Sequence, residues 1–274
     1  MDPSLNCSKP SPIRVRRWPP TDGFGPPVAW HTLKRPIETV LVAFGRPIRS
    51  LVFEIMIDIT LPSDYEWPQH LFITGTNTGI GKTIVTGLIA KHLQTSRRVI
   101  TQKWIQTGCT APIAEDLASH WAIRKRTPEV LPDCCPYQFA YPASPHLAAD
   151  LEKTRINTQT IYAAFHRLTQ QFDTVICEGA GGILVPVTPT ETLLDCVAAL
   201  ALPTVVVIGN TLGCINHSLL TIQALQAAKV PIAGLVFNAI DAETPPPIAT
   251  DNIAIIQAKT GLPILFSLPD LGAA

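Results

Sequence analysis

A glycine-rich loop that follows an apolar strand and opens a helix constrains this chain more than any other feature. Residues 72–83 read FITGTNTGIGKT. In that context consecutive backbone N–H groups can bind nucleotide phosphates, Lys82 can reach the β- and γ-oxygens, and Thr83 can bind Mg²⁺. Five residues separate Gly75 from Gly81, whereas the standard motif has four. The segment predicts a P-loop of unusual spacing. It does not decide whether the protein is a kinase, an ATPase switch or a ligase.

Apolar segments and helical segments alternate from residue 67 onward. Strands that are apolar on both faces are typical of parallel sheets covered by helices. We therefore expect residues 67–274 to form one doubly wound, mainly parallel α/β domain of the P-loop NTPase type, with ligands beyond the carboxyl ends of the strands. The expected strands are residues 70–75, 98–102, 174–177, 204–208, 232–237 and 264–268, and the expected helices are residues 82–93, 158–171, 216–228 and 249–260.

The first 66 residues differ from the rest in composition. Eleven of the 26 prolines lie in the first 70 residues, and neither strand nor helix periodicity is sustained there. We therefore expect a poorly structured N-terminal extension over residues 1–66. Met56 is the only methionine besides Met1. The extension is either a mis-assigned start, with Met56 as the true initiator, or a lineage-specific addition.

Charge and cysteine content exclude several classes of protein. Acidic and basic residues number 21 each, which argues against a general nucleic-acid binder, since phosphate contacts need an excess of Lys and Arg. The seven cysteines form no CxxC pair, so neither a zinc site nor a disulfide framework is expected. The longest apolar run, residues 197–208, is too short to span a membrane, and no signal peptide is recognisable. We expect a cytoplasmic protein.

Two acids and a lysine are placed where they could act on a bound phosphate. Glu178 follows the expected strand 174–177, so its carboxylate should lie at the carboxyl edge of the sheet, within reach of a metal ion. Asp116 begins a helical stretch, where an acid ordinarily favours the helix dipole. Lys103 follows the second strand, where it could stabilise a transferring phosphoryl group or be a surface lysine.

Five motifs, taken together and in order, resemble the dethiobiotin synthetase family over residues 71–270. They are the P-loop spacing of residues 75–83, the EGAGG run of residues 178–182, the ASPH run of residues 143–146, the LGCINH run of residues 212–217 followed by Thr221, and Asn238 at the end of a strand.

The resemblance implies an ATP-dependent ligase of biotin biosynthesis. It implies that 7,8-diaminononanoate, CO₂ and Mg-ATP give dethiobiotin, ADP and phosphate through a carbamate and a carbamic-phosphoric anhydride. It also implies that Lys103 is catalytic, and that the enzyme is a homodimer in which N–H groups of residues 213–216 bind the substrate carboxylate in the partner's site.

The resemblance assigns further residues by position. The implied Mg²⁺ ligands are Thr83, Asp116 and Glu178. The implied nucleotide-binding residues are Gly79, Ile80, Gly81, Lys82, Thr83, Ile84, Asp116, Glu178, Gly179, Ala180, Gly181, Asn238, Ala239, Pro269, Asp270 and Leu271. The implied substrate-binding residues are Thr107, Ser144, Gly213, Cys214, Ile215 and Asn216.

Several positions depart from the family's pattern. A Trp-Ile pair follows Lys103 where the family usually has proline and valine, Thr107 stands where serine is common, and Gly79 stands where some members have glutamate. The chain ends at Ala274, so we expect a short far wall for the adenine pocket.

Two other functions use a related domain. A regulatory ATPase of the Min/Par type resembles this fold but has a second lysine near the start of its P-loop, where residues 76–78 are Thr-Asn-Thr. An amidotransferase-type ligase resembles this domain joined to a glutaminase, which this chain does not include. Phosphate release that requires the diamine distinguishes the synthetase from both.

Overall fold

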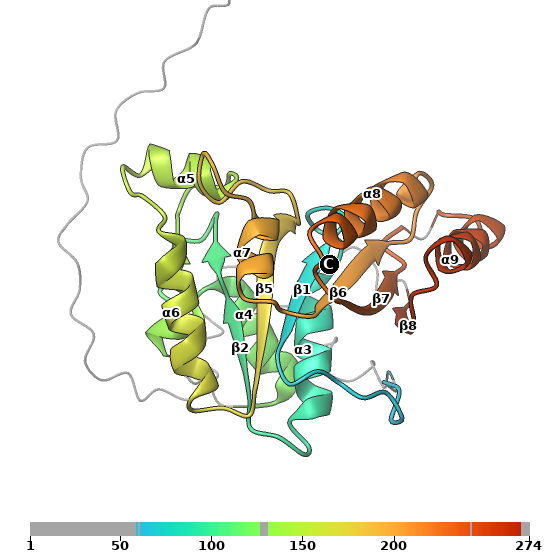
Figure 1. The fold of residues 1–274 in the computed structure, drawn as a ribbon, viewed down its shortest axis with the longest axis horizontal. Helices are drawn as coiled ribbons and strands as arrows, with labels where there is room; N and C mark the ends of the chain where they lie inside the picture. The colour runs from blue at the N-terminus through green and yellow to red at the C-terminus, as the bar shows by residue number, and fades with distance from the viewer. Residues whose placement is uncertain (1–58, 60, 127–130, 242, 270–274) are drawn as a thin grey trace, which may run out of the picture.

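The computed structural model describes residue 59 and residues 61–126, 131–241 and 243–269 of the 274-residue chain. These residues form a six-stranded parallel sheet in the order β2-β5-β1-β6-β7-β8 (Figure 1). The doubly wound α/β fold predicted from the sequence is thus confirmed. The strands are β1 (Leu71–Gly75), β2 (Val99–Lys103), β5 (Thr174–Gly182), β6 (Thr204–Gly209), β7 (Ile232–Asn238) and β8 (Ile264–Leu268).

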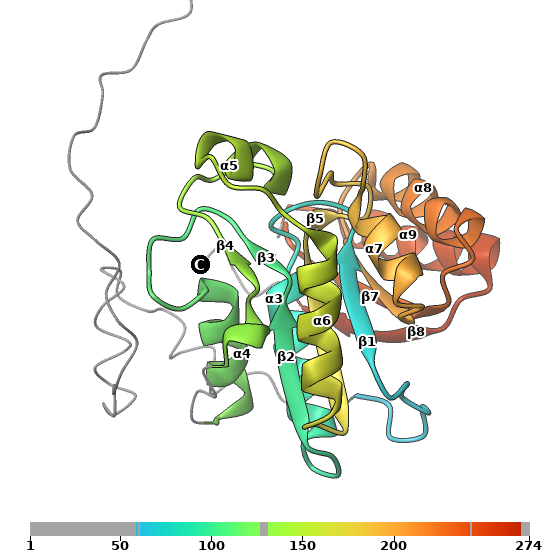
Figure 2. The same ribbon diagram turned by 60° about the vertical axis from the view of Figure 1, so that its left-hand side comes forward.

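Helices cover both faces of the sheet (Figure 2). They are α3 (Lys82–Leu93), α4 (Glu115–Arg124), α5 (Pro145–Leu151), α6 (Thr158–Thr169), α7 (Leu193–Ala199), α8 (Cys214–Ala227) and α9 (Pro246–Thr260). The alternation of side chains along β1 separates the two faces. Leu71 and Ile73 pack with α3, whereas Phe72 packs on the opposite face with α6, α7 and α8. Helix α4 packs against α3 and β2.

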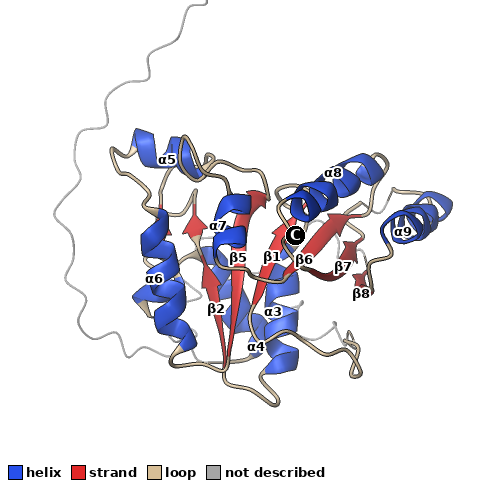
Figure 3. Ribbon diagram, in the orientation of Figure 1, coloured by secondary structure: helices blue, strands red, loops and turns tan. Residues whose placement is uncertain are grey.

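Figure 3 shows the helices and strands of the structure. The six main strands and the helices α3, α6, α8 and α9 lie where the sequence predicted them, with small differences at their ends. The sequence did not predict α5, α7, the 3-10 helix η1 (Pro132–Cys134), or a separate two-stranded sheet of β3 (Ile105–Gln106) and β4 (Tyr137–Gln138). These elements are at most 7 residues long, which is too short to show a clear hydrophobic period.

Strand β5 is longer than predicted, and this changes the setting of Glu178. The sequence predicted a strand over residues 174–177, with Glu178 just after its end. In the structure the strand continues to Gly182, and Glu178 is fully buried. The cause is pairing with β1, in which Ile73 lies opposite Glu178 and Gly75 opposite Gly182.

Residues just before β1 pack onto the domain. Leu61 and Trp67 are each 5% exposed and join the apolar cluster on the α3 side of the sheet. The Tyr65 hydroxyl donates a hydrogen bond to the Ala233 carbonyl at 2.6 Å, and Arg97 donates to the Trp67 carbonyl at 3.2 Å. The packed domain therefore includes residues before the predicted boundary at 67. Residues 1–58 of the predicted extension lie outside the described residues.

Two truncated chains should distinguish the contribution of the packed residues Leu61 and Trp67 from that of the residues before Met56. A chain that begins at Met56 should keep the thermal stability of the full chain, because it retains Leu61 and Trp67. A chain that begins at Gln69 loses both side chains, and losing a buried Trp costs about 3–5 kcal/mol. Its midpoint of thermal unfolding should fall by about 10 °C, measured by circular dichroism. An insoluble Met56 chain would show that residues 1–55 belong to the packed fold.

Two further expectations concern cysteines and membranes. Cys177 and Cys196 are free and fully buried. Burial raises the pKa of the Cys177 thiol, so this side chain behaves as an apolar core residue. Within the ranges that the structure describes, no helix combines the length and apolar character needed to cross a membrane.

Candidate active site

The P-loop lies between β1 and α3, at the carboxyl edge of the sheet (Figure 1). Gly81 precedes α3 with a φ of 92°, a conformation that glycine adopts readily. A Cβ at this position would lie 2.4 Å from Asn238 Nδ2. Lys82 is 7% exposed and donates a hydrogen bond to the Asn77 carbonyl at 2.9 Å. The loop is therefore closed by its own lysine and leads directly into a helix N-terminus.

Sheet register brings Lys103 and Glu178 together. Lys103 is the last residue of β2 and lies opposite Glu178 on β5. The Lys103 Nζ is 2.8 Å from Glu178 Oε1 and 3.0 Å from the Gly179 carbonyl oxygen. Lys103 is 4% exposed and Glu178 is 0% exposed. The alternative of a surface lysine at position 103 is therefore wrong, and the Glu178 carboxylate is shielded from solvent.

Helix α4 adds a second carboxylate, and α3 adds a hydroxyl. Asp116 Oδ2 lies 2.6 Å from Lys103 Nζ. The Thr83 hydroxyl lies 3.0 Å from Asp116 Oδ1 and 3.1 Å from Glu178 Oε1, so it can donate to one of them at a time. We call Lys82, Thr83, Lys103, Asp116 and Glu178 the charged cluster. Its members come from α3, β2, α4 and β5.

The charged cluster balances two ammonium groups against two carboxylates. Burial lowers the pKa of Lys82 to about 8, and the nearby charge of Lys103 contributes to this decrease. Burial alone would also lower the pKa of Lys103, but the charges of Glu178 and Asp116 outweigh it and raise that pKa. Burial alone would raise the pKa of Glu178, but Lys103 and a hydrogen bond from His120 hold it well below its usual range. Lys103 and Glu178 are therefore both charged at neutral pH.

Sequence analysis missed one member of this site, His120. This residue lies on α4 one turn after Asp116 and is fully buried, with Nε2 2.7 Å from Glu178 Oε2. Its Nδ1 atom has no hydrogen-bond partner among the described residues. The available signal was the four-residue spacing from Asp116, which places both side chains on one face of a helix.

The Trp-Ile pair after Lys103 is accommodated by packing. Trp104 is fully buried, with its ring centroid 4.5 Å from that of Phe72. Its indole N–H donates to Gln102 Oε1 at 3.1 Å, and its backbone N–H donates to the Glu178 carbonyl at 3.2 Å. These contacts fix the backbone on both sides of Lys103 without the proline that the family usually has there.

The glycines after Glu178 lie next to the P-loop. A Cβ on Gly182 would lie 3.4 Å from the Gly75 carbonyl oxygen. Gly181 has a φ of 73°, and a Cβ there would lie 3.4 Å from Thr78 Oγ1. Ala180 lies half-buried on the same strand. The predicted EGAGG motif is therefore adjacent to the predicted P-loop.

The end of β7 is tied to the P-loop through Asn238. This side chain is 5% exposed and donates from Nδ2 to the Ile80 carbonyl at 2.9 Å. Its Oδ1 is buried and has no partner among the described residues. A buried acceptor without a partner is unusual in a folded protein, so this oxygen is suited to a ligand's N–H group.

The remaining predicted nucleotide-binding residues lie near these elements or beyond the described chain. Ile84 is half-buried in the first turn of α3, and Gly79 is exposed in the loop with a φ of 73°. Ala239 follows β7 and donates its backbone N–H to the Leu268 carbonyl at 3.0 Å. Pro269 is exposed after β8. Asp270 and Leu271 lie outside the described residues.

Two of the predicted substrate residues lie in neighbouring segments. Thr107 is half-buried after β3, and the next residue, Gly108, donates its backbone N–H to the Tyr141 carbonyl at 3.2 Å. Ser144 precedes α5, and its side chain makes no capping hydrogen bond. Within the described chain, neither side chain hydrogen-bonds to the charged cluster.

The start of α8 lies at the same edge of the sheet but is open to solvent. Strand β6, which pairs with β1, ends at Gly209, and α8 begins at Cys214. Gly213 precedes the helix with a φ of 90°. Leu212 is 80% exposed, and Asn216 is also exposed. In the described chain, no hydrogen bond joins residues 213–216 to the charged cluster.

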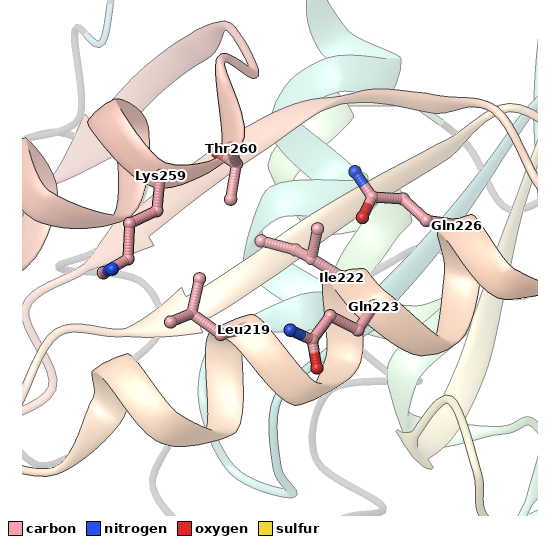
Figure 4. Close-up of a pocket in the computed structure, with 6 residues that line it drawn as sticks. All are labelled: Leu219, Ile222, Gln223, Gln226, Lys259 and Thr260. Atoms are coloured by element: carbon pink, nitrogen blue, oxygen red, sulfur yellow. The ribbon is translucent and has the colours of Figure 1, made fainter.

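Two hollows lie away from these residues. One, of about 280 Å³, lies between α8 and α9, and Figure 4 shows Ile222, Lys259 and Thr260 among the side chains that line it. The other, of about 840 Å³, is lined by residues at the opposite end of β2, including Arg97 and Arg98. Neither includes a residue of the charged cluster, so neither competes with it as a candidate active site.

Comparisons with known proteins show what this chain is similar to. A family model for an AAA domain matches residues 69–273. An ATP-dependent dethiobiotin synthetase from Pasteurella multocida is 46% identical over 171 residues, which are 61% of this chain and 80% of that protein. One from Nitrosospira multiformis is 38% identical over 202 residues, which are 72% of this chain and 87% of that protein.

A solved structure of a ParA family ATPase from Chlorobium tepidum also aligns with this chain. It covers 74% of this chain and 85% of its own, at 16% sequence identity and a TM-score of 0.47. A likeness at this level decides neither the activity nor the substrate.

Proposed function

The chain belongs to the family of ATP-dependent dethiobiotin synthetases, and from this premise we infer that it catalyses the ATP-dependent closure of the ureido ring of dethiobiotin in biotin biosynthesis. The structural observation that supports this most directly is the Lys103 ammonium, held between two carboxylates beside a P-loop. A Min/Par-type ATPase and an amidotransferase are not favoured, because relatives at 38% and 46% identity are named synthetases.

The reaction needs no protein nucleophile. One amine of 7,8-diaminononanoate attacks CO₂, loses a proton and becomes a carbamate. A carbamate oxygen attacks the γ-phosphorus of ATP, which gives a carbamic-phosphoric anhydride and ADP. The second amine attacks the carbamate carbon, loses a proton and expels phosphate as the ring closes. The protein must therefore position reactants and stabilise negative oxygen atoms.

Lys103 is suited to the negative oxygens of the carbamate and the γ-phosphate. Its raised pKa keeps it protonated, so it acts as a charge and hydrogen-bond donor and not as a base. Lys82 is suited to the β- and γ-phosphates, which would replace the Asn77 carbonyl as its partner. The Asn238 Oδ1 can accept a hydrogen bond from the exocyclic amino group of adenine.

The donor set fits Mg²⁺. This ion prefers oxygen ligands, and the Thr83 hydroxyl lies within 3.1 Å of both the Asp116 and the Glu178 carboxylates. Bound Mg²⁺ would supply the positive charge that a triphosphate needs, because the lysines of the cluster are already balanced by its carboxylates. Among the described residues, no three His, Cys, Asp or Glu side chains form a metal site of their own. We therefore expect the ion to bind together with the nucleotide.

We also propose that the enzyme is a homodimer whose α8 start serves the partner's site. The N-terminus of this 14-residue helix can bind a substrate carboxylate through backbone N–H groups. The start of α8 makes no hydrogen bond to its own charged cluster in the described chain, and it carries the exposed Leu212. Both features are consistent with a role in another subunit.

Hybrid dimers should test this arrangement. Gly213→Val should displace the helix start, since a β-branched residue disfavours the φ of 90°. Lys103→Ala and Gly213→Val should each be nearly inactive, but mixing them should restore about a quarter of wild-type turnover, because half of the exchanged dimers would each have one intact site. Subunit exchange is checked with differently tagged chains. No rescue after confirmed exchange would indicate a self-contained site.

Location and partners follow from the same proposal. The substrates are small molecules, and the free buried thiols of Cys177 and Cys196 suit a reducing compartment. We therefore place the enzyme in the cytoplasm, without a nucleic-acid or membrane partner.

A direct assay tests the function. Purified protein is incubated with Mg-ATP, bicarbonate and 7,8-diaminononanoate, and dethiobiotin is measured by mass spectrometry together with released phosphate. We expect dethiobiotin and phosphate in equal amounts, and both only when the diamine is present. Phosphate release at the same rate with and without the diamine would favour a regulatory ATPase. A protein that binds ATP but forms no dethiobiotin would refute the synthetase activity.

A further inference from the structure

We propose that His120 is a positioning residue that holds the Glu178 carboxylate in the orientation required for Mg²⁺ binding. This inference rests on the proposed role of Glu178 as a metal ligand. It assigns a function to a residue that belongs to none of the sequence motifs.

The two oxygens of Glu178 face different partners. Oε1 lies 2.8 Å from the Lys103 ammonium and 3.1 Å from the Thr83 hydroxyl, on the side of the P-loop helix. Oε2 lies 2.7 Å from His120 Nε2. A carboxylate that is anchored through one oxygen cannot rotate freely about its last side-chain bond. The His120 contact therefore keeps Oε1 directed toward Lys103 and Thr83.

The hydrogen-bond partners of His120 identify Nε2 as its donor atom. A carboxylate with a depressed pKa is an acceptor only, so the short contact requires a hydrogen on Nε2. The Nδ1 atom has no partner among the described residues, and a buried N–H there would lack an acceptor. The ring therefore directs its Nε2–H group at Glu178 Oε2.

Helix α4 couples His120 to the other carboxylate of the site. Asp116 and His120 lie one turn apart on this helix, so both point toward Glu178 and Lys103. Leu117 and Trp121, at 3% and 4% exposed, anchor the same helix in the apolar core. Partners that orient ligating carboxylates typically contribute about tenfold to a hundredfold to metal affinity.

Two amide substitutions of His120 separate positioning from simple packing. The side-chain nitrogen of glutamine is as many bonds from Cα as histidine Nε2, whereas that of asparagine corresponds to Nδ1. His120→Gln should therefore keep the hydrogen bond to Glu178, and His120→Asn should lose it. Ser119→Ala, at an exposed position of the same helix, is the matched control.

The measurement is Mg²⁺ affinity in the presence of saturating ADP, by isothermal titration calorimetry. His120→Asn should weaken Mg²⁺ binding by about tenfold or more, while His120→Gln should change it by less than about threefold. ADP affinity without Mg²⁺ should stay unchanged in all three variants. Equal Mg²⁺ affinities for the Asn and Gln variants would overturn the inference.

A second measurement needs no variant. Nitrogen-15 NMR of labelled histidine in the wild-type protein should show His120 with its hydrogen on Nε2, and a hydrogen on Nδ1 alone would overturn the inference even if the variants failed to fold. The test is independent of ring closure. If the wild type makes dethiobiotin but the two variants bind Mg²⁺ equally, only this inference fails. If the variants differ as expected but no dethiobiotin forms, only the proposed function fails.

Discussion

Replacing Lys103 with alanine should lower kcat by at least about a hundredfold while leaving ATP affinity nearly unchanged. The reason is that negative charge develops on the carbamate and phosphoryl oxygens during the reaction, and Lys103 is the buried cation beside the P-loop whose pKa is raised. Lys82 remains to hold the phosphates in the ground state. Steady-state kinetics with 7,8-diaminononanoate and calorimetry with ATP measure the two quantities separately.

The cluster makes one control essential for this prediction. Removing Lys103 leaves Asp116 and Glu178 close together without their shared cation, and an unpaired buried charge destabilises a protein by about 3–5 kcal/mol. The midpoint of thermal unfolding of the variant must therefore lie well above the assay temperature. Lys91→Ala, at a half-buried lysine near the end of α3, is the matched substitution and should leave kcat unchanged. A folded Lys103→Ala enzyme with wild-type kcat would remove Lys103 from the chemistry.

The fold was largely predictable from the sequence because its long elements have clear local patterns. The β-branched run of β6 and the start of α3 at Lys82 are examples, and both lie where periodicity and the P-loop motif predicted them. The extension of β5 through Gly182 was not predictable in this way. It depends on pairing with Gly75 of a distant strand, which local propensity does not record.

The candidate site was predictable only where a motif marked it. The P-loop identified Lys82 and Thr83, and Glu178 stood beside a recognisable glycine run. The sequence alone did not decide whether Lys103 is a surface lysine or part of the site. Its burial between two carboxylates follows from the pairing of β2 with β5. His120 carried no motif, because its function depends on the Oε2 atom of a residue 58 positions away.

Glu178→Gln should lower turnover by at least about a hundredfold and raise the Mg²⁺ concentration needed for half-maximal activity. The substitution preserves volume but removes a charge that faces Lys103. It also creates a conflict of donors. Both carboxylate oxygens accept hydrogen bonds, from Lys103 and His120, whereas an amide has one acceptor and one donor end. One of the two neighbours must then face an N–H group.

The control for this variant is Asp173→Asn, an acid-to-amide change at the opposite end of β5. Asp173 is exposed and pairs with Arg98 on the surface, so its loss should leave turnover and Mg²⁺ dependence unchanged.

Acid unfolding gives a second readout of the Glu178→Gln substitution. Because the folded-state pKa of Glu178 lies below its ordinary value of 4.5, its ionised form stabilises the native state above that pH, and this contribution is lost as pH falls below it. Urea unfolding should show a shallower loss of stability toward acid for Glu178→Gln than for wild type. If Glu178→Gln has wild-type turnover at limiting Mg²⁺, the metal role of this carboxylate is refuted, whatever the result of urea unfolding at acid pH.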